Sequence, residues 1–362
     1  MRERNGFLLD PDVVYLNHGA FGACPQHVFD AYQAWQRQLE HAPIDLVERR
    51  LEDELAQVRA VLGRYVGASA DDLALVINAT AALNAVLRSL ALGPGDEILT
   101  TVHEYGGIEL LLEFVSERTG AQVVRATGVD ADAIWDGVTE RTRVLLVSHV
   151  TSPTALLLPI EELCRRARGA GVLSVIDGAH GPGQVPLALE RDGPDFYAGN
   201  CHKWLCAPKG AGFLYARSER QQLVEPLVVG WGYGESEFAL GDDWRSTRDP
   251  AAYLAIPAAI EFVREHGHAA ECRELLRTGS QCLGAEGFDA FAPDQPLQMA
   301  SFLLPECDPQ EVQQRLFDEF RIEAPARDWN GRQLLRVSVA PYNDLEDIDR
   351  LTDALVAVFR GI

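Results

Sequence analysis

The sequence predicts an α/β protein with a mostly parallel sheet in a large domain, followed by a small C-terminal α+β domain. Short apolar runs alternate with segments of helical hydrophobic periodicity, which is the pattern of parallel strands joined by helices. The 362 residues are enough for about two domains. From residue 298 onward the pattern changes to two apolar strands and two helical segments, which indicates a compact second unit.

Seven short apolar runs are expected to form the large sheet, and segments of helical periodicity are expected to connect and cover it. The strands are predicted at Leu73–Ile77, Glu97–Val102, Gln122–Arg125, Thr142–Val147, Leu173–Ile176, Phe196–Ala198 and Gly212–Tyr215. The helices are predicted at Leu46–Val66, Ala81–Leu90, Ile108–Thr119, Ile160–Arg168, Pro250–His266, Ala269–Glu286 and Pro309–Phe320. The C-terminal unit adds strands at Gln298–Leu303 and Leu334–Val339 and an amphipathic helix at Leu345–Phe359.

The boundary between the two domains is expected in the long helical segment after Asp249. Residues 18–250 would then form the large domain and residues 251–362 the small C-terminal domain. Residues 1–17 are expected to pack with the small domain.

The composition excludes several classes of partner. Acidic residues outnumber basic ones 54 to 32, which gives a formal net charge of −22 and disfavours binding to nucleic acid or to an anionic membrane surface. No apolar run approaches the roughly 20 residues that span a bilayer, and the N-terminus lacks the apolar core of a signal peptide. Seven cysteines without a C-x-x-C pair or metal-ligand array indicate reduced thiols in a cytoplasmic protein.

Polar residues follow the predicted strands repeatedly, and ligands of open α/β sheets bind at the carboxyl ends of strands. These clusters are Asn78–Thr80, His103–Tyr105, Ser148–Thr154, Asp177–His180 and Asn200–Lys203. One shared site is therefore expected. Of the basic residues only Lys203 and Lys209 are lysines, so any chemistry that needs a lysine amine must use this short stretch.

Four of these features have a functional and a purely structural interpretation. Thr80 at a helix start suits a phosphate, but Thr and Asn are also common helix caps. Asp177 could hold a pyridinium nitrogen in its protonated form, or it could belong to a turn. A partly desolvated Lys203 could form an imine, whereas most lysines simply lie on the surface. Arg336, which alternates with apolar residues, could bind a carboxylate or form a structural ion pair.

Together these motifs resemble the class V branch of the fold type I enzymes that use pyridoxal 5'-phosphate (PLP). The resemblance is most specific between Asp195 and Leu214, where a strand, the His202-Lys203 pair and a glycine-rich loop follow one another. It extends from Tyr15-Leu16-Asn17-His18-Gly19 to Arg336-Val337-Ser338 and so covers nearly the whole chain. The segments Leu16–Gly22, His149–Thr154 and Thr247–Asp249 are similar to the isopenicillin N epimerase-like subgroup, which also includes lyases that act on sulfur-linked amino acids.

The resemblance implies a PLP-transferase fold and a role for each matching residue. Lys203 would hold the cofactor as an imine, Asp177 would pair with the pyridine nitrogen, His103 would stack on the ring, and His180 would lie near the ring hydroxyl. Arg336 would bind the substrate α-carboxylate, with Asn17 and His18 lining the substrate side. The phosphate would be held by Ala79, Thr80, Asn200 and His202, together with Ser246 or Thr247 of a partner subunit, which implies a homodimer with active sites at the interface.

Two departures from the family pattern bear on this assignment. Many relatives have Asn where this chain has Ser152, also expected near the ring hydroxyl. Desulfurases carry a mobile cysteine shortly before the carboxylate-binding arginine, but Glu323–Leu335 contains none, so a persulfide-forming desulfurase is not expected.

The favoured function is a PLP-dependent epimerase or racemase of the isopenicillin N type, acting at Cα of an amino acid. The alternatives are a carbon–sulfur β-lyase on a cysteine S-conjugate, and aminotransferase or decarboxylative chemistry. Epimerisation needs a second acid, for which Tyr105, His18, Tyr233 and Tyr342 are the candidates. A cofactor-binding regulator without activity is disfavoured by the acidic charge, and the G-x-G-x-x-G, G-x-x-x-x-G-K-[ST] and G-x-S-x-G motifs of other α/β enzymes are absent.

Overall fold

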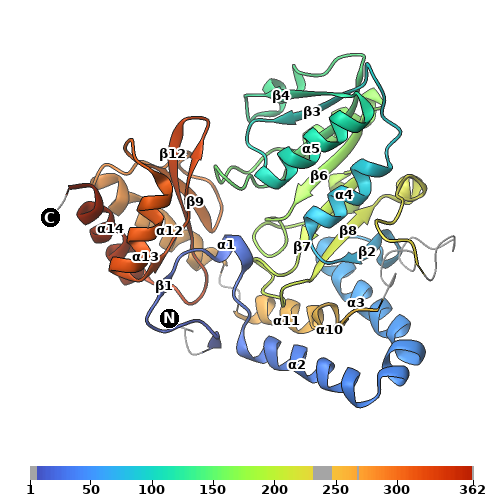
Figure 1. Cartoon of the computed structure of the whole chain (residues 1–362), viewed down its shortest axis with the longest axis horizontal. Helices are drawn as coiled ribbons and strands as arrows, with labels where there is room; N and C mark the ends of the chain where they lie inside the picture. The colour runs from blue at the N-terminus through green and yellow to red at the C-terminus, as the bar shows by residue number, and fades with distance from the viewer. Residues whose placement is uncertain (1–5, 231–246, 267–268, 361–362) are drawn as a thin grey trace.

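The computed structural model describes residues 6–230, 247–266 and 269–360. It contains two units, with a large sheet and its covering helices in one and a smaller sheet with helices on its outer side in the other (Figure 1). Helix α1 (His18–Phe21) lies between them.

The large sheet has the seven strands that the sequence predicts, in the order β2-β8-β7-β6-β5-β3-β4. Only β8 runs antiparallel to its neighbours, so the sheet is mostly parallel, as the sequence predicts. The strands are β2 (Leu73–Val76), β3 (Glu97–Thr101), β4 (Gln122–Ala126), β5 (Thr142–Ser148), β6 (Leu173–Gly178), β7 (Phe196–Asn200) and β8 (Gly212–Ala216).

Helices cover both faces of this sheet because successive side chains of each strand point to opposite faces. In β5, Val144 and Leu146 join the core under α4 (Ala79–Ser89) and α5 (Gly106–Thr119). Leu145 and Val147 belong to the core on the opposite face, beneath α3 (Leu51–Val66) and α7 (Ile160–Ala170). Short elements complete this unit: a π-helical turn at Asp45–Arg50, 3-10 turns at Ala70–Asp72 and Ser218–Leu223, α6 (Ala131–Trp135) and α8 (Leu189–Asp192).

Helix α2 (Gln26–His41) has no counterpart among the predicted helices. Val28 is its only buried residue, although Val28, Tyr32, Trp35 and Leu39 recur at the spacing of a helical apolar stripe. The helix packs against α10 (Ala251–Leu254) and α11 (Ile256–His266), which also contact α3 (Figure 1). Residues such as Tyr253 and Ile260 belong to the core of the large unit. We therefore propose to place the domain boundary after α11 rather than at residue 250.

The small unit has its own core and a three-stranded antiparallel sheet in the order β11-β12-β9. Its strands are β9 (Met299–Leu303), β11 (Ala326–Trp329) and β12 (Arg332–Ser338), and its helices are α12 (Ala269–Ala285), α13 (Pro309–Phe320) and α14 (Leu345–Arg360). Near the N-terminus, β1 (Val14–Tyr15) pairs in parallel with β10 (Ile322–Glu323) of this unit, and Val14 and Leu16 lie in its core.

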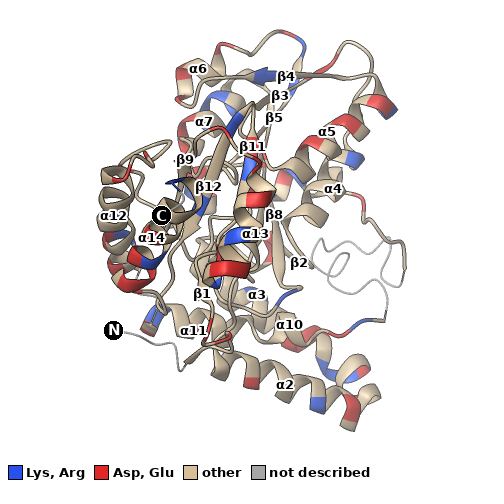
Figure 2. Cartoon of the chain, turned by 60° about the vertical axis from the view of Figure 1, so that its left-hand side comes forward, with Lys and Arg blue, Asp and Glu red and all other residues tan. Residues whose placement is uncertain are grey.

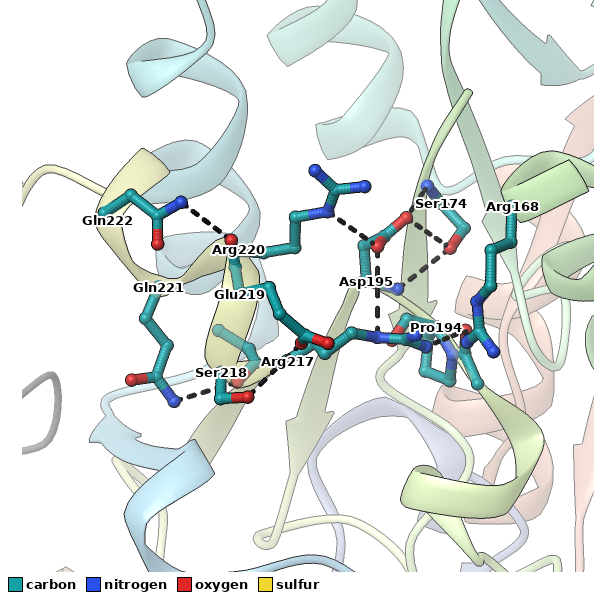
Figure 3. Close-up of polar contacts among 12 residues, drawn as sticks. Arg168, Ser174, Pro194, Asp195, Arg217, Ser218, Glu219, Arg220, Gln221 and Gln222 are labelled. Carbon is teal, nitrogen blue, oxygen red and sulfur yellow. Dashed lines mark hydrogen bonds and ion pairs between the residues drawn. The ribbon is translucent and has the colours of Figure 1, made fainter. Parts of the chain in front are cut away.

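A cluster of polar side chains connects β6, β7 and the turn after β8 by hydrogen bonds at the amino end of the parallel strands (Figure 3). The carboxylate of Asp195 accepts hydrogen bonds from the backbone N–H of Ser174 at 2.9 Å and from Nε of Arg220 at 3.0 Å. Arg217 contributes an N–H to the carbonyl of Gly193 at 2.7 Å. This cluster is at the end of the sheet opposite the carboxyl strand ends, so its acids and bases are structural.

The excess of acidic residues is spread over the outer helices, with red segments along α2, α5 and α14 in Figure 2. Among the described residues, no helix has the length and apolar character needed to cross a bilayer. All seven cysteines are free thiols.

Candidate active site

The carboxyl ends of the strands bring most of the predicted residues to one region between the two units. Asp177 lies in β6, Asn200 ends β7, and Lys203 follows three residues later. From the small unit, Arg336 of β12 reaches across to Ser152 after β5. The side chains that bear the chemistry therefore come from segments far apart in the sequence.

Lys203 contacts His180, and a hydrogen bond from the neighbouring Trp204 determines which nitrogen of His180 carries the proton. Nζ of Lys203 lies 3.2 Å from Nε2 of His180, and Nε1 of Trp204 donates to Nδ1 of the same ring at 3.2 Å. Since Nδ1 accepts a hydrogen bond, the proton of a neutral His180 is on Nε2 and is donated to Lys203. Only an uncharged amine can accept it.

The electrostatic environment favours the same uncharged form of Lys203. Burial and the nearby Arg336 guanidinium lower its pKa to about 7, which outweighs the opposing effect of Asp177. Burial, with Lys203 and Arg336 nearby, also holds the pKa of His180 well below its ordinary value, so the imidazole is neutral. An uncharged, buried lysine amine is a nucleophile that can condense with an aldehyde.

The second lysine has different surroundings. Nζ of Lys209 donates to the carbonyl of Gly22 at 2.9 Å and lies in a groove lined by apolar side chains. Its amine is thus anchored to the backbone near α1, away from His180 and Asp177. The structure therefore separates the two lysines that the sequence places six residues apart.

Asp177 is buried, and its Oδ1 accepts the N–H of Ala179 at 2.9 Å. Burial raises its pKa, and within the described part of the chain it forms no ion pair. A cation placed beside this carboxylate would compensate the cost of burying its charge. Asp177 therefore fits a protonated ring nitrogen.

Glu104 is a second buried acid near Asp177, and the sequence assigned it no role. Its carboxyl accepts hydrogen bonds from the hydroxyls of Thr101 at 2.7 Å and Ser148 at 2.6 Å. Burial raises its pKa to about 7, and the proximity of Asp177 adds to the shift. The sequence signal for such a group was an acidic residue three residues after a buried strand.

His103 is expected to stack on a cofactor ring, and it is in a stacked arrangement with Trp329 of the small unit. The ring centroids are 4.8 Å apart at an interplanar angle of 23°. Nδ1 of His103 is 3.1 Å from the hydroxyl of Thr154, and Nε1 of Trp329 donates to the carbonyl of Val102. This aromatic contact joins the two units at the edge of the site, and no sequence pattern pointed to Trp329.

Arg336 is a buried cation without an anionic partner among the described residues. Its Nη1 donates to the carbonyl and to the hydroxyl of Ser152, both at 3.0 Å, while its Nε has no partner. Burial and the neighbouring Arg327 lower the pKa of Arg336 to about 9. A buried guanidinium fork with free donors fits a carboxylate. Ser152, expected beside a ring hydroxyl, contacts this guanidinium.

The predicted phosphate-binding residues meet at the start of α4. Asn78 caps the helix through Ala81, and the N–H of Ala79 donates to Oδ1 of Asn200 at 2.8 Å. Thr80 lies in the first helical turn, where N–H groups and the helix dipole favour an anion. Nδ1 of His202 is 3.2 Å from the carbonyl of Ala211, on the adjacent loop.

The remaining predicted residues have other surroundings. Nδ2 of Asn17 donates to Glu323 at 3.1 Å, while its Oδ1 is buried without a partner. His18 lies behind the lysine, with Nε2 donating to the carbonyl of Lys203 at 3.1 Å and Nδ1 3.0 Å from the hydroxyl of Tyr342. Thr247 is exposed, and Ser246 and Tyr233 lie outside the described residues.

The donor set fits an aldehyde cofactor that has a basic ring nitrogen and a phosphate. Lys203 provides the amine, Asp177 the buried anion for the ring nitrogen, and α4 the amino end of a helix for the phosphate. Arg336 remains free for the carboxylate of an amino acid.

Comparisons with known proteins agree with this chemistry. The family model described as Aminotransferase class-V matches residues 14–351. The chain is 37% identical to an isopenicillin N epimerase of Streptomyces clavuligerus, over 98% of this chain and 97% of that protein. It is 30% identical to a probable chloroplastic L-cysteine desulfhydrase of Arabidopsis thaliana, over 97% of this chain and 84% of that protein.

The fold also matches that of a solved structure. A structure of a C-DES variant with glycine covalently linked to its PLP cofactor has a TM-score of 0.85 at 24% identity, covering 98% of this chain and 99% of that one. From the match of the family model over most of the chain, the fold and the donor set, we conclude that the chain belongs to the Aminotransferase class-V family and is a PLP-dependent enzyme.

Proposed function

We propose that this enzyme is an amino-acid epimerase or racemase of the isopenicillin N epimerase type. The observation that carries the proposal is the buried amine of Lys203, whose Nζ lies 3.2 Å from Nε2 of His180 and whose pKa is lowered to about 7 with Asp177 and Arg336 in electrostatic range. The 37% and 36% identities to isopenicillin N epimerases, over 98% and 96% of the chain, support this choice of reaction.

Each residue has a distinct task in this reaction. When bound, PLP supplies an electron sink that acidifies the Cα–H bond of the amino acid. Arg336 binds and orients the α-carboxylate, and Ser152 holds the guanidinium in place. Lys203 is the base that accepts the Cα proton at Nζ. Asp177 stabilises positive charge on the ring nitrogen.

Inversion at Cα needs an acid on the opposite face, and we assign this role to Tyr105. His18 and Tyr342 are engaged with each other behind the backbone of Lys203. Tyr105 has 45% of its surface exposed, and its phenol is close enough to affect the pKa of both Arg327 and Arg336. The Tyr105→Phe enzyme should still exchange the Cα proton but should lose inversion.

A carbon–sulfur β-lyase is the second candidate, because a relative at 30% identity is named a probable L-cysteine desulfhydrase. Elimination needs only a leaving group on Cβ, and hence no second acid. Incubation with amino acids and cysteine S-conjugates in deuterated water separates the two reactions. Deuterium incorporation with inversion supports the epimerase, whereas pyruvate and a thiol identify the lyase and a 2-keto acid identifies a transaminase.

The covalent assignment is tested on the two lysines. Borohydride treatment of purified enzyme followed by peptide mapping should place the reduced cofactor on Lys203. Lys203→Ala should abolish the visible band near ~420 nm that this cofactor gives when linked to lysine, and Lys209→Ala should retain it. Equal effects of the two substitutions would refute the assignment.

We also propose a homodimer and a cytoplasmic location. The exposed Thr247 and the family pattern support a partner subunit that completes the phosphate site. Seven free thiols support a reducing compartment. Analytical ultracentrifugation tests the assembly, and fractionation of the source cells tests the location.

A further inference from the structure

We propose that Arg327 binds a second anionic group of the substrate, so that the enzyme acts on amino acids whose side chain carries a carboxylate or another anion. This inference rests on the proposed function, because it uses Arg336 as the site of the α-carboxylate. It adds a specificity-determining residue and a chemical class of substrate.

The register of the small sheet places Arg327 on the face that closes the active site. Opposite residues of an antiparallel pair point to the same face, and Arg327 is opposite Leu334, two residues before Arg336. Arg327 and Arg336 are therefore diagonal neighbours on one face, with Cα atoms roughly 7–8 Å apart. Trp329 is two residues further along β11 and shares this face.

Contacts on either side of Arg327 show where this face points. Trp329 stacks on His103, and Arg336 donates to Ser152, so both neighbours reach the carboxyl strand ends of the large unit. Arg327 lies between these two contacts. Its charge also lowers the pKa of Arg336, Lys203 and His180, which agrees with a position at the site.

Arg327 has no anionic partner in the part of the chain that the structure describes. Its Nε is buried without a hydrogen-bond partner. The adjacent acid, Asp328, is exposed, and its carboxylate instead accepts from the N–H of Gly331 at 3.2 Å and from Gln333 at 3.3 Å. The phenol of Tyr105 also lies in electrostatic range of Arg327.

Two guanidinium groups that share one face repel each other, and the lowered pKa of both reflects burial and, for Arg336, this repulsion. A ligand with a single carboxylate compensates only one of them. A ligand with two anionic groups, one on Cα and one a few bonds away, compensates both and gains a charge-assisted hydrogen bond at each end.

The test compares ligands that differ in the charge of the distal group. The probes are the pairs aspartate and asparagine, and glutamate and glutamine, titrated into PLP-loaded enzyme while the cofactor spectrum reports binding. Wild type, Arg327→Gln and Arg327→Lys are compared. Arg277→Gln is the control, because it removes an exposed arginine of the same unit that is paired with Glu274.

We expect wild type and Arg277→Gln to bind the dianionic member of at least one pair about 10- to 100-fold more tightly than its amide. Arg327→Gln should remove this preference without weakening the amide, and Arg327→Lys should retain part of it. Equal weakening of acid and amide in Arg327→Gln would show that both arginines hold the α-carboxylate, which overturns the proposal. The lack of any preference in wild type would overturn it as well. A missing cofactor band in wild type would instead refute the proposed function.

Discussion

Nζ of Lys203 and Nε2 of His180 lie 3.2 Å apart. The hydrogen-bond donor at Nδ1, on the other side of the imidazole ring, determines whether the proton of this contact is on His180 or on Lys203. Trp204 occupies Nδ1 as a donor, so His180 donates through Nε2. The lysine amine is therefore held in the form that reacts with an aldehyde. Trp204 thus acts on the nucleophile through His180.

Trp204→Phe removes this donor while keeping an aromatic ring in the same place. His180 can then carry its proton on Nδ1 and accept a hydrogen bond from a Lys203 ammonium. We expect the pKa of Lys203 to rise by up to about one unit, the value of one ordinary hydrogen bond. The measurement is the pH dependence of acylation of Lys203 in the cofactor-free protein, followed by mass spectrometry. An unchanged midpoint would contradict the tautomer assignment.

The shifted pKa of Lys203 also predicts a pH-dependent stability. Its pKa is about 7 in the folded protein and near 10.5 when unfolded, so between these values the unfolded chain binds more protons. This group therefore makes the free energy of unfolding rise with pH, with a slope approaching about 1.4 kcal/mol per pH unit. Below pH 7 the folded protein bears the full cost of a buried ammonium.

The Lys203→Met variant has no amine at this position, so its folded state does not bear the cost of a buried ammonium. In urea unfolding of the cofactor-free proteins between pH 6 and pH 9, the variant should be more stable than wild type at the acidic end. The difference should shrink as the pH rises. A difference that does not vary with pH would show that Lys203 stays charged in the folded protein throughout the range, which contradicts its lowered pKa.

Asp177→Asn tests the buried anion without disturbing the local turn. The amide oxygen can still accept the N–H of Ala179, so the fold should be retained. Without the negative charge, the ring nitrogen is no longer held protonated, and Cα acidity falls. We expect exchange of the Cα proton to slow about 100-fold or more while the cofactor still binds. Near-normal exchange rates, measured by NMR in deuterated water, would remove Asp177 from this role.

Local sequence patterns were sufficient for much of the fold and for the central residues of the site. The seven strands of the large sheet are short apolar runs; Asp177 lies near the end of one of them, and Lys203 follows another. Helix α2 was not predicted although Val28, Tyr32, Trp35 and Leu39 recur at helical spacing, so this helix was within reach of the sequence pattern.

Contacts between the two units were not predictable in the same way. Trp329 on His103 and Arg336 on Ser152 join positions 226 and 184 residues apart, and neither pair has a local signature. Glu104 acquires its raised pKa only once Thr101, Ser148 and Asp177 surround it. Such properties arise from tertiary packing, so they appear only in the folded chain.

Ser152 distinguishes two interpretations of the site. A serine beside the ring hydroxyl would tune the cofactor spectrum, whereas the structure has its hydroxyl accepting a hydrogen bond from Nη1 of Arg336 at 3.0 Å. Ser152→Ala removes this bond but keeps the backbone carbonyl that accepts from the same nitrogen. We expect KM for the amino acid to rise about 5- to 10-fold, since a hydrogen bond to a charged group orients the guanidinium, with little change in kcat or in the visible spectrum. A shifted absorption band with an unchanged KM would instead place Ser152 against the cofactor. The hydroxyl of Ser152 would then not be what orients the guanidinium of Arg336.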